Sequence, residues 1–252
     1  MRRFAMMLAA AAIGLAGGAA LAAEGPAAPE QTWSFAGLFG TFDRAAQQRG
    51  FQVYNQVCSA CHGLSFVAYR NLEAIGFTAD DVKAIAAERE VTDGPNDEGE
   101  MYQRPARPSD AFVSPFPNDQ AARVANNGAL PPDLSLITKA RPDGANYLHG
   151  LLVGYGEPPA DLTVPDGMYY NAYFAGHQIA MPPPLSEGAV EFADGTPATV
   201  EQMAEDVTVF LSWAAEPELE ARKRMGVKTL LFLIVFTGML YAVKRKVWMK
   251  LH

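Results

Sequence analysis

The sequence contains two cysteines, Cys58 and Cys61, and a histidine, His62, follows the second one directly. This C-x-x-C-H spacing is the pattern of covalent haem attachment. Two thiols three positions apart can reach the two vinyl groups along one edge of a porphyrin, and the next residue can then bring its imidazole beneath the iron. The spacing therefore predicts one covalently bound haem c, with His62 as an axial ligand of the iron.

Three other uses of a closely spaced cysteine pair are weaker. A structural zinc site usually takes four Cys or His ligands, and the chain has no second cysteine pair. A thioredoxin-like redox pair would want a strand before the motif, whereas the apolar residues at 51, 54, 57 and 58 have helical spacing. A plain disulfide would leave His62 without a role. Haem attachment accounts for all three residues.

A second axial ligand must come from another segment, and the globular part offers four methionines and two histidines: Met101, Met168, Met181, Met203, His149 and His177. Met203 falls on an apolar stripe at helical spacing and is expected in the core. Met101 lies in an acidic stretch and is expected to be exposed, and Met168 lies beside tyrosines against which it could simply pack. Met181 precedes three prolines, which fix the backbone and make a stiff loop able to hold a thioether against iron. We therefore favour Met181.

Ligation by one histidine and one methionine has a chemical consequence. It leaves the iron no open position, which suits electron transfer and disfavours a haem enzyme such as a peroxidase. Methionine also raises the reduction potential relative to ligation by two imidazoles. These residues therefore predict an electron carrier that is not an enzyme by itself.

The N-terminal end reads as a secretory signal peptide over residues 1–22. A basic start precedes an apolar run, and Ala20-Leu21-Ala22 forms a cleavage pattern. An uncleaved membrane anchor is less favoured, because Gly17 and Gly18 break the run before it reaches the ~20 residues that a span needs. The signal predicts export of residues 23–221 as a periplasmic domain.

A second apolar run, Met225–Val243, lies near the C-terminus. At ~1.5 Å per residue it rises roughly 28 Å, which is close to the hydrocarbon thickness of a bilayer. Basic residues flank it on both sides, and as a buried core helix it would have to bury them. We therefore interpret residues 222–252 as a transmembrane anchor with a short cytoplasmic tail, which places the protein in the inner membrane by a single span.

The charge balance is acidic, with 20 basic and 28 acidic residues. Removal of residues 1–22 takes away two arginines and no acidic residue, so the exported chain is more acidic still. Such a surface disfavours nucleic-acid binding and suits a basic protein partner.

The sequence predicts a few helices between many loops, since Gly and Pro are plentiful. Residues 43–58 and 200–215 are the obvious pair to pack together, the first leading into the haem motif and the second beginning at a Thr199–Gln202 capping box. Shorter helices are expected over 79–88, with Thr78 as the cap, and over about 146–153. The distance from Cys58 to Met181 predicts large insertions around the haem.

Beyond the haem motif, the chain carries more specific stretches: Trp33-Ser34-Phe35, Phe39-Gly40, Phe42-Asp43, Arg49–Tyr54, Tyr69–Leu72, Asn126–Ser135, Tyr169–Phe174, Met181–Leu185 and Arg222–Gly226. With these, the sequence from about Trp33 to its end resembles the cytochrome c1 family, the haem-bearing subunits of cytochrome bc1 complexes. The resemblance implies a mainly α, cytochrome c-like haem domain with large loop insertions and one C-terminal transmembrane helix.

The family's axial ligands, a histidine and a methionine, fall here on His62 and Met181. The resemblance also implies that Arg123 pairs with a haem propionate, since a guanidinium can bind a carboxylate through two charge-assisted hydrogen bonds. A solvated charge at a helix end remains the alternative for Arg123. Some bacterial members carry an extra disulfide, and this chain has no cysteines for one.

The same resemblance implies the partners. Electrons would arrive from a Rieske iron–sulfur subunit and leave to cytochrome c, within a dimeric membrane complex that includes cytochrome b. The stretch 73–100 holds nine acidic residues against Lys83 and Arg89, which predicts a docking surface for a basic acceptor, although a merely solvated loop remains open. A free-standing tethered shuttle is the alternative function. It is less favoured because the large domain joins its anchor almost directly.

Overall fold

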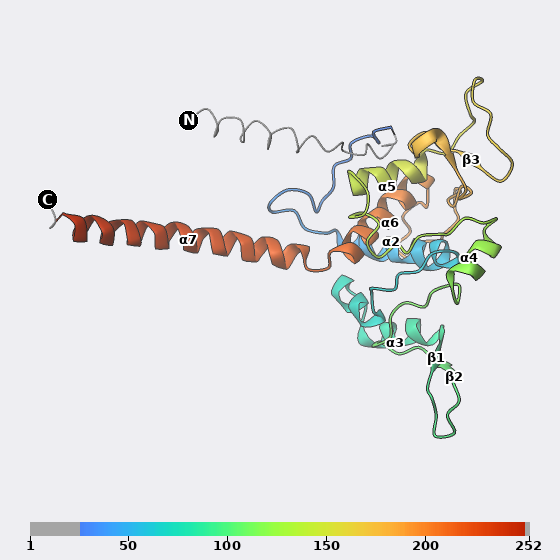
Figure 1. Ribbon diagram of the computed structural model, residues 1–252, viewed down its shortest axis with the longest axis horizontal. Helices are drawn as coiled ribbons and strands as arrows, with labels where there is room; N and C mark the ends of the chain where they lie inside the picture. Colours follow the sequence, from blue (N-terminus) through green and yellow to red (C-terminus); the bar gives the residue numbers. More distant parts are fainter. Residues whose placement is uncertain (1–25, 250–252) are drawn as a thin grey trace, which may run out of the picture.

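The computed structural model describes residues 26–249, so the predicted signal peptide and the end of the predicted tail lie outside the described residues. Helices dominate this part of the chain. A globular part contains most of the elements, and one long helix, α7 (Leu219–Trp248), extends away from it (Figure 1). This is the mainly α architecture with a long C-terminal helix that the sequence predicts.

Two helices form the centre of the globular part, α2 (Arg44–Gln56) and α6 (Val200–Ala215). The predicted helices at 43–58 and 200–215 are thus confirmed, with α2 ending just before the haem motif. The Thr199 side chain accepts a hydrogen bond from the backbone N–H of Gln202, as a capping residue should. The Gln202 side chain does not complete the predicted capping box, because it donates to Asp206 instead.

The two central helices pack against each other at Gly50. A Cβ atom at this position would lie 2.0 Å from the backbone oxygen of Asp206 and 2.7 Å from the Cβ atom of Phe210. Only glycine therefore allows so close a contact. Around the crossing, Phe51 packs edge-on against Phe210, and Trp213 stacks obliquely on Phe210. Several of the most deeply buried side chains of the core lie on these two helices.

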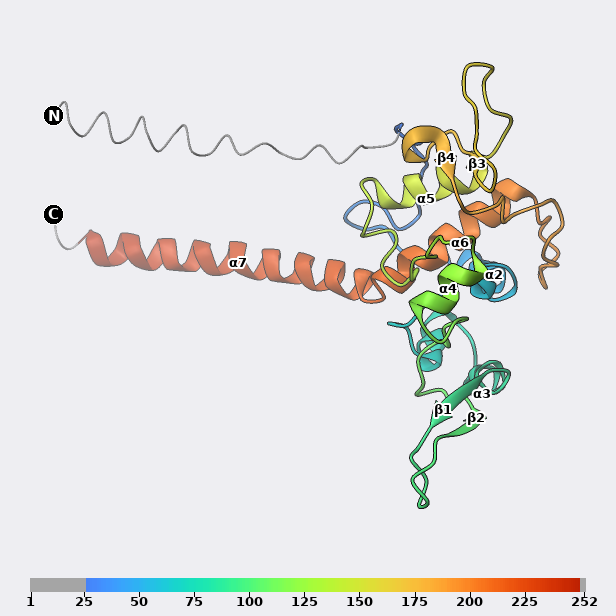
Figure 2. The same ribbon diagram turned by 45° about the vertical axis from the view of Figure 1, so that its right-hand side comes forward.

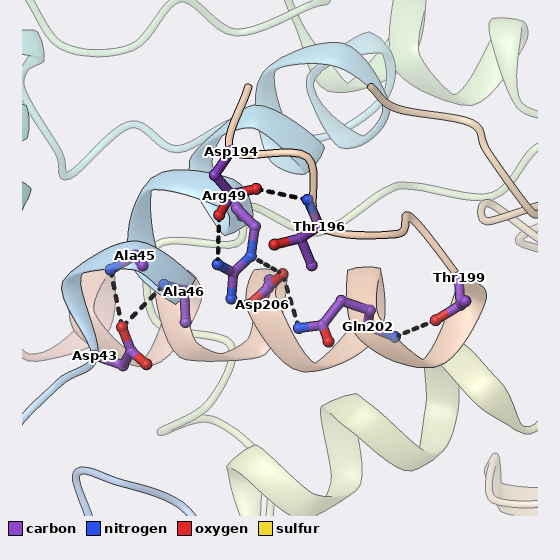
Figure 3. A network of polar contacts seen from close by, with 9 residues as sticks. All are labelled: Asp43, Ala45, Ala46, Arg49, Asp194, Thr196, Thr199, Gln202 and Asp206. Carbon is purple, nitrogen blue, oxygen red and sulfur yellow. Dashed lines mark hydrogen bonds and ion pairs between the residues drawn. The ribbon is translucent and has the colours of Figure 1, made fainter. Parts of the chain in front are cut away.

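A network of charged side chains joins the two helices at the same contact (Figure 3). Arg49 of α2 donates to both carboxylate oxygens of Asp206, at 2.7 and 2.9 Å, and to Asp194 at 2.9 Å. The Asp206 side chain is only 1% exposed. Burial raises the pKa of Asp206 above its usual value, and the Arg49 guanidinium opposes that rise. The buried carboxylate therefore depends on Arg49 for its compensation.

The remaining elements surround this pair. The predicted helix with a Thr78 cap is confirmed as α3 (Ala79–Ala87), and the helix expected from about residue 146 begins two residues earlier as α5 (Gly144–Val153). Helix α4 (Asp119–Ala125) and the 3-10 turns η1 (Cys58–Ala60), η2 (Tyr69–Ile75) and η3 (Ala175–His177) lie in the connecting segments. Two short antiparallel pairs, β1 (Glu90–Asp93) with β2 (Tyr102–Pro105) and β3 (Tyr169–Tyr170) with β4 (Gln178–Ile179), were not predicted. The two views place β1 and β2 on the opposite side of the molecule from β3 (Figures 1 and 2).

Helix α7 is longer than the apolar run from which it was predicted. It begins at Leu219, six residues before Met225, and only Glu216–Glu218 separate it from α6. Its apolar segment is long enough to cross a membrane, and the window that qualifies has no residue buried inside the protein. It is the membrane anchor of the chain.

We expect Arg49→Met to lower the free energy of unfolding by about 3–5 kcal/mol, because it leaves the buried Asp206 carboxylate without a counter-charge. Losing Arg49 also raises the pKa of Asp206 further, so the deficit should be full at neutral pH and shrink as the carboxylate becomes protonated at acid pH. A urea titration of the purified chain in detergent, followed by tryptophan fluorescence, measures it.

Two further variants control this experiment. Arg70→Met removes an exposed arginine that forms no ion pair within the described residues and should cost little. Adding Asp206→Leu to Arg49→Met should restore much of the stability, because an apolar pair needs no compensation. A loss no larger than that of Arg70→Met would show that the ion pair does not stabilise the helix contact.

Candidate haem site

The three residues of the haem motif lie on one turn at the end of α2. The backbone N–H groups of Cys61 and His62 both donate to the backbone oxygen of Cys58, at 3.1 and 2.9 Å. Cys58 is half-buried, Cys61 is exposed, and both are free thiols. Because α2 leads directly into this turn, the packing of α2 on α6 fixes where the two thiols lie.

The His62 imidazole is fixed through its Nδ1 atom, which lies 2.8 Å from the backbone oxygen of Pro132. A carbonyl oxygen can only accept, so Nδ1 carries the proton and Nε2 keeps its lone pair. Burial lowers the pKa of His62, which favours this neutral form. Tyr54 adds a hydrogen bond from its hydroxyl to the backbone oxygen of His62. An imidazole so held is prepared to bind a metal through Nε2.

The carbonyl that orients His62 belongs to a loop fastened to the haem motif at several points. The Asp133 carboxylate accepts hydrogen bonds from the backbone and the hydroxyl of Ser65, at 2.9 and 2.8 Å, and from the backbone of Ser135. Leu134 N–H donates to the backbone oxygen of Gly63. Desolvation raises the pKa of Asp133, but these hydrogen bonds outweigh it and the pKa lies below its usual value. The charged carboxylate thus joins residues 63–66 to residues 132–135.

Met181 lies on a different segment, two residues after the end of β4. The Tyr155 hydroxyl donates to the backbone oxygen of Met181 at 3.1 Å, and burial raises the pKa of Tyr155, so this donor stays protonated. The segment is joined to α5 by the fully buried Asn171, whose amide donates to Leu151. Gly154 permits this approach, because a Cβ there would lie 2.7 Å from the Tyr173 ring. The methionine loop is therefore fixed by hydrogen bonds and close packing.

Arg123 lies in the last turn of α4. Its side chain is exposed and donates to the backbone oxygen of Gly128 at 3.1 Å. Within residues 26–249, no hydrogen bond or ion pair joins Arg123 or Met181 to the turn that carries Cys58, Cys61 and His62. The structure thus brings the three motif residues together and leaves Arg123, on α4, and Met181, on a loop, in separate segments.

The other candidate ligands have different surroundings. Met203 is fully buried in the core, as its helical spacing predicted, and Met101 is 61% exposed. His149 is buried between Trp33, with which it packs edge-on, and Glu201, whose carboxylate lies 3.2 Å away. His177 stacks on Tyr170. Met203 has no exposed surface through which its sulfur could meet a bound group.

The surroundings of Cys58 also disfavour a redox-active cysteine pair. Burial raises the pKa of Cys58 to about 12, the opposite of the lowered pKa that makes a redox-active thiol nucleophilic. No group of three or more His, Cys, Asp or Glu among the described residues is arranged to hold a metal ion. A covalently attached haem, in contrast, fits the donors present: two thiols on one turn and an imidazole with Nε2 available.

Comparison with known proteins agrees with this donor set. Residues 33–251 match the model of the Cytochrome C1 family. The chain belongs to the cytochrome c1 family. Proteins of this family carry a covalently bound haem c and serve as electron-transfer subunits, so the predicted cofactor and the electron-carrying role are confirmed at this level.

Individual relatives span bacteria and plants. Cytochrome c1 of Rhodospirillum rubrum is 51% identical over 249 residues, which cover 92% of each chain. Cytochrome c1-2 of Solanum tuberosum mitochondria is 54% identical over 212 residues, or 84% of this chain and 82% of the relative. Cytochrome b/c1 of Bradyrhizobium diazoefficiens is 51% identical over 246 residues, and there the match spans 89% of this chain but 36% of the longer relative.

Sequence reasoning missed the residues that support the site. Pro132 and Asp133 stood out only as part of a turn and a family-like stretch, although they orient His62 and fasten its loop. Asn171 stood out only within the family-like stretch Tyr169–Phe174, and Tyr155 was not singled out at all. A carboxylate following a Pro-Pro pair could have suggested an anchored loop, but nothing in the sequence shows that its partner is Ser65.

We expect Asp133→Ala to lower the free energy of unfolding by roughly 1–3 kcal/mol, because two N–H groups and a hydroxyl lose their shared acceptor. Asp161→Ala is the matched control, since Asp161 is exposed on a loop and makes no hydrogen bond or ion pair within residues 26–249. Denaturant titration of both variants measures the difference. Equal stability of the two would show that the Asp133 contacts are dispensable.

Proposed function

We propose that the chain carries one haem c on Cys58 and Cys61, with His62 and Met181 as axial ligands, and passes electrons from a Rieske iron–sulfur subunit to cytochrome c. The observation that carries the proposal is the turn at the end of α2. It presents two free thiols next to an imidazole whose Nδ1 is held by Pro132. Haem c, when bound, supplies an iron that takes up and releases one electron.

The protein's own groups hold the first ligand in place. The hydrogen bond to Pro132 fixes the ring orientation of His62 and makes its Nε2 a better donor. Asp133 keeps the Pro132 carbonyl in position through its bonds to Ser65 and Ser135. A ligand supported in this way keeps the same geometry in both oxidation states, which favours electron transfer.

Met181 is the methionine best suited to be the second ligand. Met203 is fully buried and Met101 is on an exposed hairpin. Met168 and Met181 are both half-buried, but only Met181 lies in a loop that is bonded by Tyr155 and stiffened by prolines. Because that loop is fixed at its backbone, the thioether can be held without a disulfide. Both faces of the iron would then be occupied, which excludes peroxidase-type chemistry at this site.

Arg123 is a partner for a haem propionate. Its guanidinium is exposed and uses Nη1 to bond Gly128, which leaves further N–H donors free for a carboxylate. The positive φ angles of Asn127 and Gly128 form the turn that brings Gly128 back to the end of α4. The arginine would thus be held by its own loop while it binds the propionate.

The joint between the globular part and the anchor supports a fixed subunit over a tethered shuttle. Only three residues separate α6 from α7, and Glu216 among them forms ion pairs with Arg222 and Lys139. A shuttle needs a long flexible linker, whereas the joint between α6 and α7 has three residues. We therefore place the chain in a dimeric cytochrome bc1 complex with cytochrome b. Its haem domain lies in the periplasm, and the tail after α7 lies in the cytoplasm.

The acidic segment 73–100 remains a candidate docking surface for cytochrome c. Two of its carboxylates have structural roles, since Asp81 bonds the Thr78 cap and Asp93 pairs with Arg104. The other seven carboxylates are exposed, and they extend from η2 to the β1–β2 hairpin: Glu73, Asp80, Glu88, Glu90, Asp97, Glu98 and Glu100. Charges without structural roles are free to steer a basic partner.

Met181→Leu should abolish the absorption of a thioether bound to iron near the red end of the visible spectrum and lower the midpoint potential, because the sixth ligand is lost. The reduced variant should also bind carbon monoxide. Met101→Leu is the matched control and should change neither property. A spectrum unchanged by Met181→Leu would exclude Met181 as the ligand.

The rate of electron transfer to a basic cytochrome c should fall steeply as ionic strength rises, because screening weakens attraction to the acidic surface. Glu98→Gln with Glu100→Gln should flatten this dependence, since both carboxylates are exposed and their turn is held by Asn96 through backbone bonds. Asp161→Asn with Asp166→Asn removes the same charge elsewhere. A rate that does not respond to salt would contradict docking on this segment.

A further inference from the structure

The segment just before α2 forms an ordered loop with two apolar side chains turned outward. Leu38 is 56% exposed and Phe39 is 79% exposed. The loop is closed at its base, where Thr41 N–H donates to the backbone oxygen of Ser34 at 3.1 Å. Large apolar side chains exposed side by side on an ordered loop indicate a contact surface.

The shape of the loop is fixed by its glycines and by packing beneath it. Gly37 has a φ of 67°, and a Cβ at Gly40 would lie 1.9 Å from the backbone oxygen of Ala36. Phe35 packs between Trp33 and Phe42, with ring centroids 5.6 and 4.9 Å away. The neighbouring aromatic ring thus faces the protein while Leu38 and Phe39 remain outside.

The loop is fastened to the first turns of α7. The Lys223 ammonium donates to the backbone oxygens of Phe35, at 2.6 Å, and of Gly40, at 3.2 Å. Glu220, one turn earlier on α7, accepts from the backbone of Phe42 and pairs with Arg44. The two ends of the loop are therefore attached to the point where the membrane helix leaves the globular part.

This attachment places the loop at the level where the apolar part of α7 begins. Val227, one turn beyond Lys223 on the same face, is half-buried, and every later described residue of α7 up to Met249 is exposed. The apolar run starts at Met225, so the globular part reaches just past its edge. In both views the described segment that precedes α2, drawn in blue, extends from the globular part on the side from which α7 leaves (Figures 1 and 2).

We propose that Leu38 and Phe39 insert into the membrane interface and give the haem domain a second contact with lipid beside α7. Lys223 holds the loop that carries the exposed apolar pair beside the start of the apolar run of α7, and burying the pair in the interface removes it from water. Arg224 and Lys228 lie on α7 near the same level and form no ion pair within the described residues, so they suit anionic headgroups. The Lys223 ammonium is hydrogen-bonded to two carbonyl oxygens of the loop, so two of its three donors stay satisfied as the loop approaches lipid.

Spin labelling tests this contact in the full chain carrying its haem, in nanodiscs of phosphatidylcholine and phosphatidylglycerol. With the haem attached as proposed to both native cysteines, Phe39→Cys or Leu38→Cys provides a single site for a nitroxide. The parent chain gives the background labelling. Met101→Cys is the matched control, because Met101 is an exposed apolar residue beside β2, away from α7 (Figure 1).

Oxygen concentrates in lipid, whereas a nickel chelate stays in water. The ratio of nitroxide collisions with oxygen to collisions with the chelate should be severalfold higher at positions 38 and 39 than at position 101. A label at 39 as open to the chelate as the one at 101 would place the loop in water. A label hidden from both reagents would place it against protein. Either of these two results would overturn the proposal.

Discussion

The close crossing of α2 and α6 is the contact on which the rest of the structure depends. It requires a glycine at position 50, because any Cβ would overlap the backbone of Asp206, and it buries a carboxylate that Arg49 must compensate. An apolar core alone would tolerate some sliding between the helices. A buried ion pair beside a glycine contact tolerates much less, since a small shift would separate the charges. The crossing therefore fixes the register of α2 on α6.

That register matters because the haem motif begins two residues after α2 ends. The segments that carry Met181 and that orient His62 are loops instead of helices. Their rigidity comes from polar side chains that bond backbone groups: Asp133 between residues 63–66 and 132–135, Asn171 between α5 and β3, and Tyr155 to Met181. Each of these side chains satisfies backbone donors or acceptors that a loop would otherwise expose or leave unpaired. The long insertions thus become a fixed frame around the site, which explains how two loops far apart in sequence could serve one iron.

The sequence was sufficient for the features that depend on local pattern. The helical spacing of residues 200–214 predicted α6 and the burial of Met203, and Thr78 predicted the start of α3. The sequence was insufficient where the role of a side chain depends on a contact with another side chain. Gln202 looked like half of a capping box, but its amide bonds Asp206, because a buried carboxylate competes strongly for a donor. The role of Asp133 depends on Ser65, 68 residues away, and no periodicity records such a pairing.

The same helix that carries the haem motif is also attached to the membrane anchor. At its start, Arg44 and the preceding Phe42 bind Glu220 of α7, and at its end α2 passes into the turn of Cys58. A helix of 13 residues is about 20 Å long. The start of α2 is hydrogen-bonded to α7, and its side packs on α6. Helix α2 therefore connects the membrane anchor to the thiols as a rigid element. The distance and orientation of the haem above the lipid would then be set by one helix rather than by a linker, and a partner that brings or takes electrons would be the component that has to move.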